Sequence, residues 1–300
     1  MTAVGLLGIG RMGAAMGRAL SAGGFELVAW NRSPAGAARL IGELGRGRVA
    51  GTPAEVAAAV DVCITMLADG DAVDAVFAGP DGLLQGAHGD SVLCDASTVA
   101  PATLRAHEAT ARAAGAGLLD TPVSGSVTLA EAGRLTIMAG GTAADLAVAR
   151  PVLDALATTV FHLGPLGSGA AMKLAVNTVI FGLNQALAEA LTLATAAGID
   201  RAAAYDVLTA SAAGAPFVGY KRAAFLEPDT TPVAFAVDLA AKDLRLIADL
   251  ARDVGVRLPG ALTDLAVIDA TVAAGGGQRD FSTVTSQLHA GDRGEEDRPD

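Results

Sequence analysis

The sequence predicts an α/β chain in which a doubly wound parallel sheet, covered by helices, is followed by an all-α domain. Two observations lead to this fold class. From Ala3 to about Leu163, short β-like runs alternate with Ala-rich helical stretches, as is typical of parallel βαβ units. After Gly169 this alternation gives way to long stretches rich in Ala and Leu.

The chain has 300 residues, 52% of them hydrophobic, which suits two domains with buried cores. Its net charge of −11 disfavours nucleic acid as a partner, because phosphate binding needs a basic surface. Residues 155–172 are uncharged but include three glycines, a proline and a histidine, so we expect no membrane span. Since no basic secretory segment precedes the first strand, we expect a cytoplasmic protein that acts on a small molecule.

The predicted strands are short apolar runs in the first half of the chain. They read AVGLLG, FELVAW, DVCITML, SVLCDAS, AGLLDTPV, RLTIMAGG and TTVFHLG. Cys63 and Cys94 fall within two of these runs, where we expect buried, reduced thiols rather than a disulfide or a metal site.

The second half contains two long helical patterns that end at Gly198 and Gly255, since glycine commonly terminates a helix. We expect a nucleotide-binding domain at residues 1–163 and a helical substrate and dimerisation domain at 164–291. The apolar helices exceed what one small domain can bury, which favours a homodimer or homotetramer. Residues 292–300 lack an apolar anchor and are expected to form a disordered tail.

Gly8, Gly10 and Gly13 form a G-x-G-x-x-G motif between the first strand and the first helix. In this context the first glycine permits a tight turn, the second admits a pyrophosphate, and the third lets helix and strand pack closely. The motif predicts a Rossmann-type dinucleotide site, with a purely structural turn as the alternative. The intervening residues complete the predicted cofactor-binding turn: Ile9, Arg11 and Met12.

The end of the second strand reads VAWNRSP, without the acidic residue that would bind the ribose of NAD. Asn31, Arg32 and Ser33 stand there instead, and an arginine can pair with the 2′-phosphate of NADP. We therefore expect NADP rather than NAD, the alternative being that Arg32 is a solvated loop charge. Met66 and Leu67, at the end of the third predicted run DVCITML, are also expected to contact the cofactor.

Together these motifs resemble the β-hydroxyacid dehydrogenase family, which includes 3-hydroxyisobutyrate dehydrogenases and the glyoxylate/succinic semialdehyde reductases. The matching blocks are GIGRMGAAM, DASTVAP, DTPVSGSVTLAEAGRLTIMAGG and GSGAAMKLAVN, followed by FAVDLAAKDL. The resemblance implies reversible, NAD(P)-dependent interconversion of a short hydroxy acid and its aldehydo or keto acid. It also implies that a long helix joins the Rossmann domain to the helical domain.

Two of these blocks follow predicted strands and are expected to touch ligands. Thr98, in DASTVAP, contacts the nicotinamide ribose if the resemblance holds, or caps a helix. In DTPVSGS, Ser124 and Gly125 belong to a turn that can hold a substrate carboxylate, as the family uses it. Ser126 replaces the second glycine that the family usually has there.

Lys173 and Asn177 are four residues apart in a helical run, which places both on one face of the helix. A lysine in this apolar setting can donate a proton to a carbonyl oxygen, or it can extend its ammonium to solvent as a surface residue. The resemblance favours Lys173 as the general acid and base, and both residues as substrate-binding. Thr178 replaces a second asparagine of the family.

In the block FAVDLAAKDL, the resemblance implies that Phe235 and Lys242 close over the cofactor. A charged helical face explains Lys242 equally well. Asp243 and Arg245 are expected to make local helix contacts.

The resulting prediction is an oxidoreductase that uses NADP(H) and a short β-hydroxy acid. An imine reductase on the same fold is the nearest alternative, but such relatives generally carry Asp or Tyr in place of Lys173. A non-catalytic NADPH-binding regulatory protein would not need Lys173 and Asn177 together. A Rossmann methyltransferase would leave Arg32 unexplained.

Overall fold

The structure is a computed structural model that describes residues 2–285 and 288. It divides into two compact units, Met1–Lys173 and Leu174–Asp300, each of which is described by itself. The predicted tail at 292–300 lies outside the described residues.

The first unit is built on a six-stranded parallel sheet with the order β3-β2-β1-β4-β5-β6. This is the strand order of a dinucleotide-binding sheet. From β1 the chain adds β2 and β3 on one side and then β4, β5 and β6 on the other, so the order of addition reverses between β1 and β4 while all strands stay parallel. Ligands bind such sheets at the carboxyl ends of the strands beside this reversal. The strands are β1 (Ala3–Leu7), β2 (Glu26–Trp30), β3 (Arg48–Val49), β4 (Val62–Thr65), β5 (Val92–Asp95) and β6 (Gly117–Asp120).

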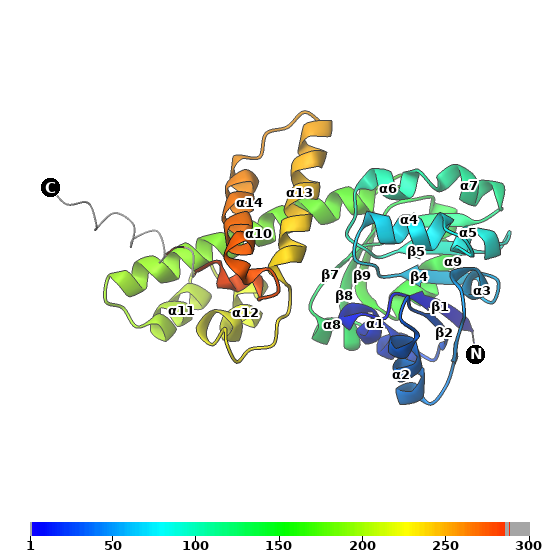
Figure 1. Ribbon diagram of the computed structural model, residues 1–300, viewed down its shortest axis with the longest axis horizontal. Helices are drawn as coiled ribbons and strands as arrows, with labels where there is room; N and C mark the ends of the chain where they lie inside the picture. The colour runs from blue at the N-terminus through cyan, green and yellow to red at the C-terminus, as the bar shows by residue number, and fades with distance from the viewer. Residues whose placement is uncertain (1, 286–287, 289–300) are drawn as a thin grey trace. The chain divides into compact units, whose positions relative to one another are not determined.

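Helices cover both faces of this sheet (Figure 1). The strands are apolar on both faces, so consecutive residues such as Leu6 and Leu7 enter opposite halves of the core. One half includes α1 (Arg11–Ala22), α2 (Pro34–Leu44), α8 (Val127–Glu131) and α9 (Ala143–Asp154). The other half includes α3 (Pro53–Ala57), α4 (Gly70–Ala78), α5 (Leu83–Gly86), α6 (Pro101–Arg105) and α7 (Glu108–Ala113).

The two cysteines lie on opposite faces of the sheet, and both are free and buried, as predicted. Burial raises the pKa of the Cys63 thiol to about 12 and raises that of Cys94 as well. Neither thiol is therefore poised for nucleophilic chemistry.

A second sheet of three strands contradicts the expectation that every predicted strand joins a parallel array. It is formed by β7 (Val123–Ser124), β8 (Leu135–Ala139) and β9 (Ala157–His162), and β7 runs antiparallel to β8. The run AGLLDTPV is thus divided between two sheets. Pro122 lies at the division, where its missing N–H cannot extend the ladder of β6.

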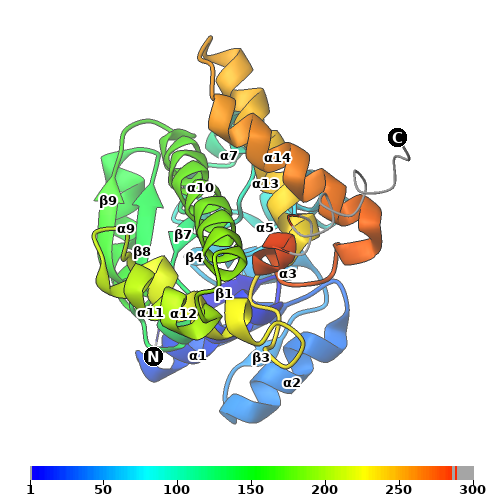
Figure 2. The ribbon, with the colours of Figure 1, turned by 90° about the vertical axis from the view of Figure 1, so that its left-hand side faces the viewer.

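The second unit is all-helical, and the two predicted helix ends are confirmed. The long α10 (Ser168–Ala196) begins in the first unit and is followed by Gly198 at φ +85°, and α13 (Val237–Asp253) by Gly255 at φ +72°. α13 packs along α14 (Pro259–Thr271) (Figure 2). The remaining elements are α11 (Arg201–Ala210), α12 (Pro216–Leu226), a π-helical turn at Val272–Gly276 and a 3₁₀ turn at Phe281–Val284. The doubly wound sheet, the all-α domain and the long helix are therefore confirmed.

By length and composition alone, α10 is apolar enough to cross a membrane, with a mean hydropathy of 1.3. A core helix of a soluble protein has the same properties. Length and composition therefore do not show that α10 spans a membrane. The helix begins in the first unit, whose sheet has the strand order of a dinucleotide-binding domain.

Candidate functional site

The turn between β1 and α1 shows which glycines the protein itself requires. Gly8 has φ +92°, and a Cβ there would collide with the carbonyl oxygen of Met66. A Cβ on Gly13 would collide with the carbonyl oxygen of Gly8. Gly10 differs, because a Cβ there would meet nothing within 4 Å among the described residues. The space left open at Gly10 fits a ligand that approaches the backbone at the start of α1.

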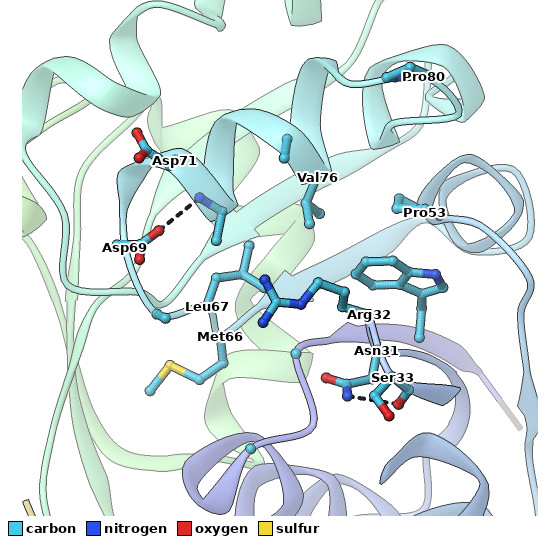
Figure 3. Close-up of a pocket in the computed structure, with 16 residues that line it drawn as sticks. Asn31, Arg32, Ser33, Pro53, Met66, Leu67, Asp69, Asp71, Val76 and Pro80 are labelled. Atoms are coloured by element: carbon cyan, nitrogen blue, oxygen red, sulfur yellow. Dashed lines mark hydrogen bonds between the residues drawn. The ribbon is translucent and has the colours of Figure 1, made fainter. Parts of the chain in front are cut away.

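A cavity of about 740 Å³ lies beside this turn, at the carboxyl ends of β1, β2 and β4 (Figure 3). This volume is in the range of small-molecule and cofactor sites. Seven residues predicted to bind the cofactor come together in its lining: Gly8, Gly10, Asn31, Arg32, Ser33, Met66 and Leu67.

Asn31 holds the end of β2 against the glycine turn. Its Oδ1 accepts a hydrogen bond of 2.8 Å from the backbone N–H of Ile9, and its Nδ2 donates one of 2.9 Å to the carbonyl of Ser33. The side chain of Arg32 is exposed and extends across the cavity toward Leu67 (Figure 3). Asn31 therefore shapes the turn, while Arg32 presents its guanidinium to the cavity.

Sequence reasoning missed part of this lining. Trp30 belongs to the lining and donates through Nε1 to the carbonyl of Gly51 at 3.3 Å. Asp69 caps α4 by accepting a hydrogen bond of 2.9 Å from the N–H of Ala72, and Asp71 follows it in the lining. An aspartate before a helical run is a recognisable N-cap signal, so Asp69 was detectable from the sequence.

The first turn of α1 also borders a second, more open cavity of about 460 Å³. Ile9, Gly10 and Arg11 contribute to its lining, together with Arg18 and Arg39. Met12 and Gly13 follow in the same turn of the helix. The charge of Arg18 is compensated, because it pairs with Glu43 at 2.7 Å and with Glu131 at 2.9 Å.

A buried carboxylate ties together two of the strand ends. Oδ1 of Asp95 accepts hydrogen bonds of 2.6 Å from the hydroxyls of Thr65 and Ser97. The Ser97 hydroxyl in turn accepts a bond of 2.8 Å from the N–H of Leu67. Burial raises the pKa of Asp95, and these hydrogen bonds counteract the rise. The cavity wall at Leu67 and the loop that carries Thr98 are thus joined below the surface.

The predicted carboxylate turn follows β7. Gly125 has φ +145°, and a Cβ there would lie 2.7 Å from Leu135 Cδ2, so the position requires glycine. Ser126 lies in extended backbone, and its hydroxyl accepts a bond of 3.3 Å from the N–H of Leu129 to cap α8. The serine that replaces the second family glycine is therefore accommodated without strain, beside Ser124.

On α10, Lys173 is half-buried and lies one turn before Asn177, which is buried. Asn177 Nδ2 donates a bond of 2.7 Å to Oδ2 of Asp243 on α13. Because this bond joins two helices, the expectation of purely local contacts is wrong for Asp243. Its pair with the neighbouring Lys242 at 2.9 Å is local. The expectation is wrong for Arg245 too, which pairs with Asp269 of α14 at 2.6 Å.

Phe235 packs in an aromatic cluster of the helical unit, 5.4 Å from the ring of Phe281. A buried ion pair fixes its backbone: Asp280 accepts a bond of 3.2 Å from the N–H of Phe235 and pairs with Lys221 at 2.7 Å. No sequence signal pointed to this pair, because its members are 59 residues apart.

The predicted site residues thus fall into groups. Four residues of the glycine turn (Gly8, Ile9, Gly10 and Arg11), three at the end of β2 (Asn31, Arg32 and Ser33), and Met66 and Leu67 line the cavities of the first unit. The residues that the structure describes as lining these cavities do not include eight predicted ones: Met12, Gly13, Thr98, Ser124, Gly125, Asn177, Phe235 and Lys242. Lys173 is not among the lining residues either.

The sheet order, the glycine turn and the cavity define a dinucleotide-binding protein. Residues 3–164 match the NAD-binding domain of 6-phosphogluconate dehydrogenase. Residues 167–288 match the NAD-binding domain of NADP-dependent 3-hydroxyisobutyrate dehydrogenase.

Individual proteins match along most of the chain. It is 32% identical to glyoxylate/succinic semialdehyde reductase 2 of Arabidopsis thaliana, covering 96% of this chain and 79% of that protein. It is also 32% identical to 3-sulfolactaldehyde reductase of Escherichia coli, covering 96% of both. The crystal structure of a 3-hydroxyisobutyrate dehydrogenase from Salmonella typhimurium superimposes with a TM-score of 0.88 at 31% identity, covering 96% of this chain and 100% of that one.

The chain belongs to the β-hydroxyacid dehydrogenase family. Its relatives are dehydrogenases and reductases, which supports an enzyme with a pyridine-nucleotide cofactor.

Proposed function

We propose that this protein is an NADP(H)-dependent oxidoreductase that interconverts a short β-hydroxy acid with the corresponding aldehydo or keto acid. The observation that carries the proposal is the pair of polar residues on α10. Lys173 and Asn177 lie one turn apart in an apolar helix, and Asp243 holds the amide of Asn177 at 2.7 Å. A protein that only binds nucleotide would not need Lys173 and Asn177 together on one face of the helix.

The residues of the first unit fit the cofactor. The open space at Gly10 and the first N–H groups of α1 would receive the pyrophosphate. Arg32, which extends across the cavity, would pair with the 2′-phosphate that distinguishes NADP from NAD. When bound, the reduced cofactor supplies a hydride to the carbonyl carbon of the substrate.

The remaining chemistry falls to side chains and amides of this chain. The ammonium of Lys173 donates the proton that the carbonyl oxygen takes up, so that the carbonyl becomes a hydroxyl. In the oxidative direction the neutral amine takes the proton back. Asn177 orients the oxygen or the lysine, and the Ser124–Gly125 turn holds the substrate carboxylate.

Replacement of Lys173 by methionine tests this assignment. Lys173→Met keeps most of the side-chain length and removes the proton donor, so we expect turnover to fall by roughly 10²- to 10⁴-fold. Lys173→Arg is the matched variant: it retains the positive charge, but its guanidinium does not release a proton at working pH. Both variants should fold and bind NADPH like the wild type.

Turnover is followed by NADPH absorbance with glyoxylate, succinic semialdehyde, methylmalonate semialdehyde, tartronate semialdehyde and a cyclic imine. Reduction of at least one aldehydo acid by the wild type, and its loss in both variants, supports the proposal. Near wild-type turnover in Lys173→Met would show that another group supplies the proton. If the wild type reduced only the cyclic imine, its activity would be that of an imine reductase and the proposal would be wrong.

A further inference from the structure

Asp120, the last residue of β6, is a buried carboxylate that reaches the start of α10. Its side chain is only 2% exposed. Oδ1 accepts a hydrogen bond of 2.6 Å from the N–H of Gly167, and Oδ2 accepts one of 2.6 Å from the N–H of Ala170. The N–H groups at the start of a helix have no partner within the helix, and a negative charge is most stabilising there. A residue 50 positions earlier in the chain therefore caps α10.

The surrounding backbone holds this carboxylate firmly in place. Asp120 pairs with Gly140 in both directions, through hydrogen bonds of 3.1 and 2.8 Å. A Cβ on Gly140 would collide with Oδ1 of Asp120, and one on Gly169 would collide with the carbonyl oxygen of Met138. Both glycines are thus needed for the start of α10 to lie against the end of β6.

Asp120 stands between the two segments to which the proposed function assigns the substrate. Ser124 follows it by four residues on one side, and Lys173 follows the bound amide of Ala170 by three residues on the other. Three residues of α-helix rise about 4.5 Å, so a shift or rotation of the first turn moves Lys173 directly. Charge-assisted bonds to two amides are strong enough to define where that turn begins.

We propose that Asp120 is a positioning residue, whose carboxylate sets the place of the Lys173 ammonium relative to the Ser124–Gly125 turn by fixing the start of α10. This inference rests on the proposed role of Lys173 as the proton donor. Burial raises the pKa of Asp120, and the amides of Gly167 and Ala170 counteract the rise. An apolar residue here would avoid the desolvation of a carboxylate but would leave the amides of Gly167 and Ala170 without this acceptor.

Asp120→Asn tests the inference, because the asparagine has the same shape but only one oxygen to accept the two amides. We expect kcat for the aldehydo acid to fall about 10²-fold, as it does when a catalytic group is displaced by about 1 Å. The Kd of NADPH should stay within about twofold of the wild-type value, because the glycine turn is untouched. Fluorescence of Trp30, the chain's single tryptophan and a residue of the cavity lining, reports that Kd.

Thr121→Val is the matched control. Thr121 is the next residue and is equally buried at 1% exposure, but its hydroxyl has no hydrogen-bond partner among the described residues. Loss of a buried hydroxyl without a partner is close to neutral. The control should therefore keep wild-type kcat, although it alters the same segment at the same depth.

The decisive measurement repeats Asp120→Asn in the Lys173→Met background. Since Asp120 acts through Lys173, the double variant should turn over no more slowly than Lys173→Met alone. A further 10²-fold loss in that background, or wild-type kcat in Asp120→Asn alone, would overturn the inference. If Lys173→Met is itself fully active, the proposed function fails and the positioning role fails with it.

Asp120→Ser provides a second variant in case the asparagine does not fold. Serine is smaller than aspartate, so it causes no steric conflict, and its shorter side chain withdraws the acceptor from both amides. It should show the same fall in kcat and the same absence of further loss beside Lys173→Met. Wild-type kcat in a folded Asp120→Ser would equally contradict the role.

Discussion

The side-chain amide of Asn177 on α10 donates a hydrogen bond of 2.7 Å to Oδ2 of Asp243 on α13. Both side chains are buried, at 6% and 2% exposure. Because the amide nitrogen faces Asp243, Oδ1 of Asn177 is directed elsewhere and can act as an acceptor. The two residues are 66 positions apart, so this bond also ties α10 to α13 within the helical unit.

Asp243→Asn should destabilise the helical unit. The substitution replaces a charged acceptor with a neutral amide and removes the ion pair with Lys242, so we expect a loss of about 1.5–3 kcal/mol in the free energy of unfolding. Urea denaturation at neutral pH measures this loss. Arg245→Gln, which breaks an exposed ion pair on the same helix, should cost less than about 1 kcal/mol. Equal losses in the two variants would show that the buried bond contributes no more to stability than the exposed ion pair does.

Gly10→Ala should fold normally and bind nucleotide poorly. The new Cβ meets nothing within 4 Å, and φ of −79° suits alanine, so the melting temperature should stay near that of the wild type. The methyl group would occupy the space expected for the pyrophosphate, and NADPH affinity should fall by roughly tenfold or more.

Gly13→Ala is the contrasting variant, since its Cβ collides with the backbone at Gly8. It should lower the melting temperature even without nucleotide. If Gly10→Ala bound NADPH as tightly as the wild type, the pyrophosphate could not lie against Gly10, and the glycine turn would not be part of the cofactor site.

Arg32→Ala should weaken NADPH and spare NADH. A charge-assisted pair with the 2′-phosphate contributes about 2–3 kcal/mol, which corresponds to a roughly 30- to 150-fold rise in Kd. NADH lacks that phosphate, so its Kd should barely change. Trp30 fluorescence measures both values, with Arg48→Ala on β3 as a control outside the cavity lining. Equal losses for the two cofactors would contradict recognition of the phosphate by Arg32.

Two buried carboxylates should respond to pH with opposite signs. Burial would raise the pKa of Asp145, but hydrogen bonds from Arg112 and Thr142 outweigh it and hold the pKa below 3.8. This contribution to stability is complete above pH 3.8 and is lost as the pH falls through the lower folded-state value. The pKa of Asp264 is raised, mainly by burial and to a smaller extent by the negative charge of Glu189. Its contribution is complete below pH 3.8 and is lost as the pH rises through the folded-state value.

Denaturation of two asparagine variants over a pH series measures these contributions. Asp145→Asn should be less stable than the wild type at neutral pH, and the difference should shrink below about pH 4. Asp264→Asn should gain stability relative to the wild type as the pH rises from about 4. A difference that moves in the same direction for both variants would contradict the assigned environments.

The sequence by itself determined the features that depend on local periodicity and spacing. Alternating β-like and helical runs predicted the doubly wound sheet, since each pattern follows from the geometry of its own element. The spacing of Gly8, Gly10 and Gly13 predicted the nucleotide turn, and the four-residue spacing of Lys173 and Asn177 placed them on one helical face.

Only the tertiary structure decided which distant groups meet. The bonds from Asp120 to Ala170 and from Asn177 to Asp243 span 50 and 66 residues, and no local period encodes a contact of that length. Likewise, the motif predicts different roles for the three glycines, but only the packed turn shows which backbone atoms a Cβ would meet: the carbonyl oxygen of Met66 at Gly8, that of Gly8 at Gly13, and nothing within 4 Å among the described residues at Gly10. Side-chain identity limits what a residue can do, whereas the choice of its partner depends on how separate elements pack, which is a property of the whole fold.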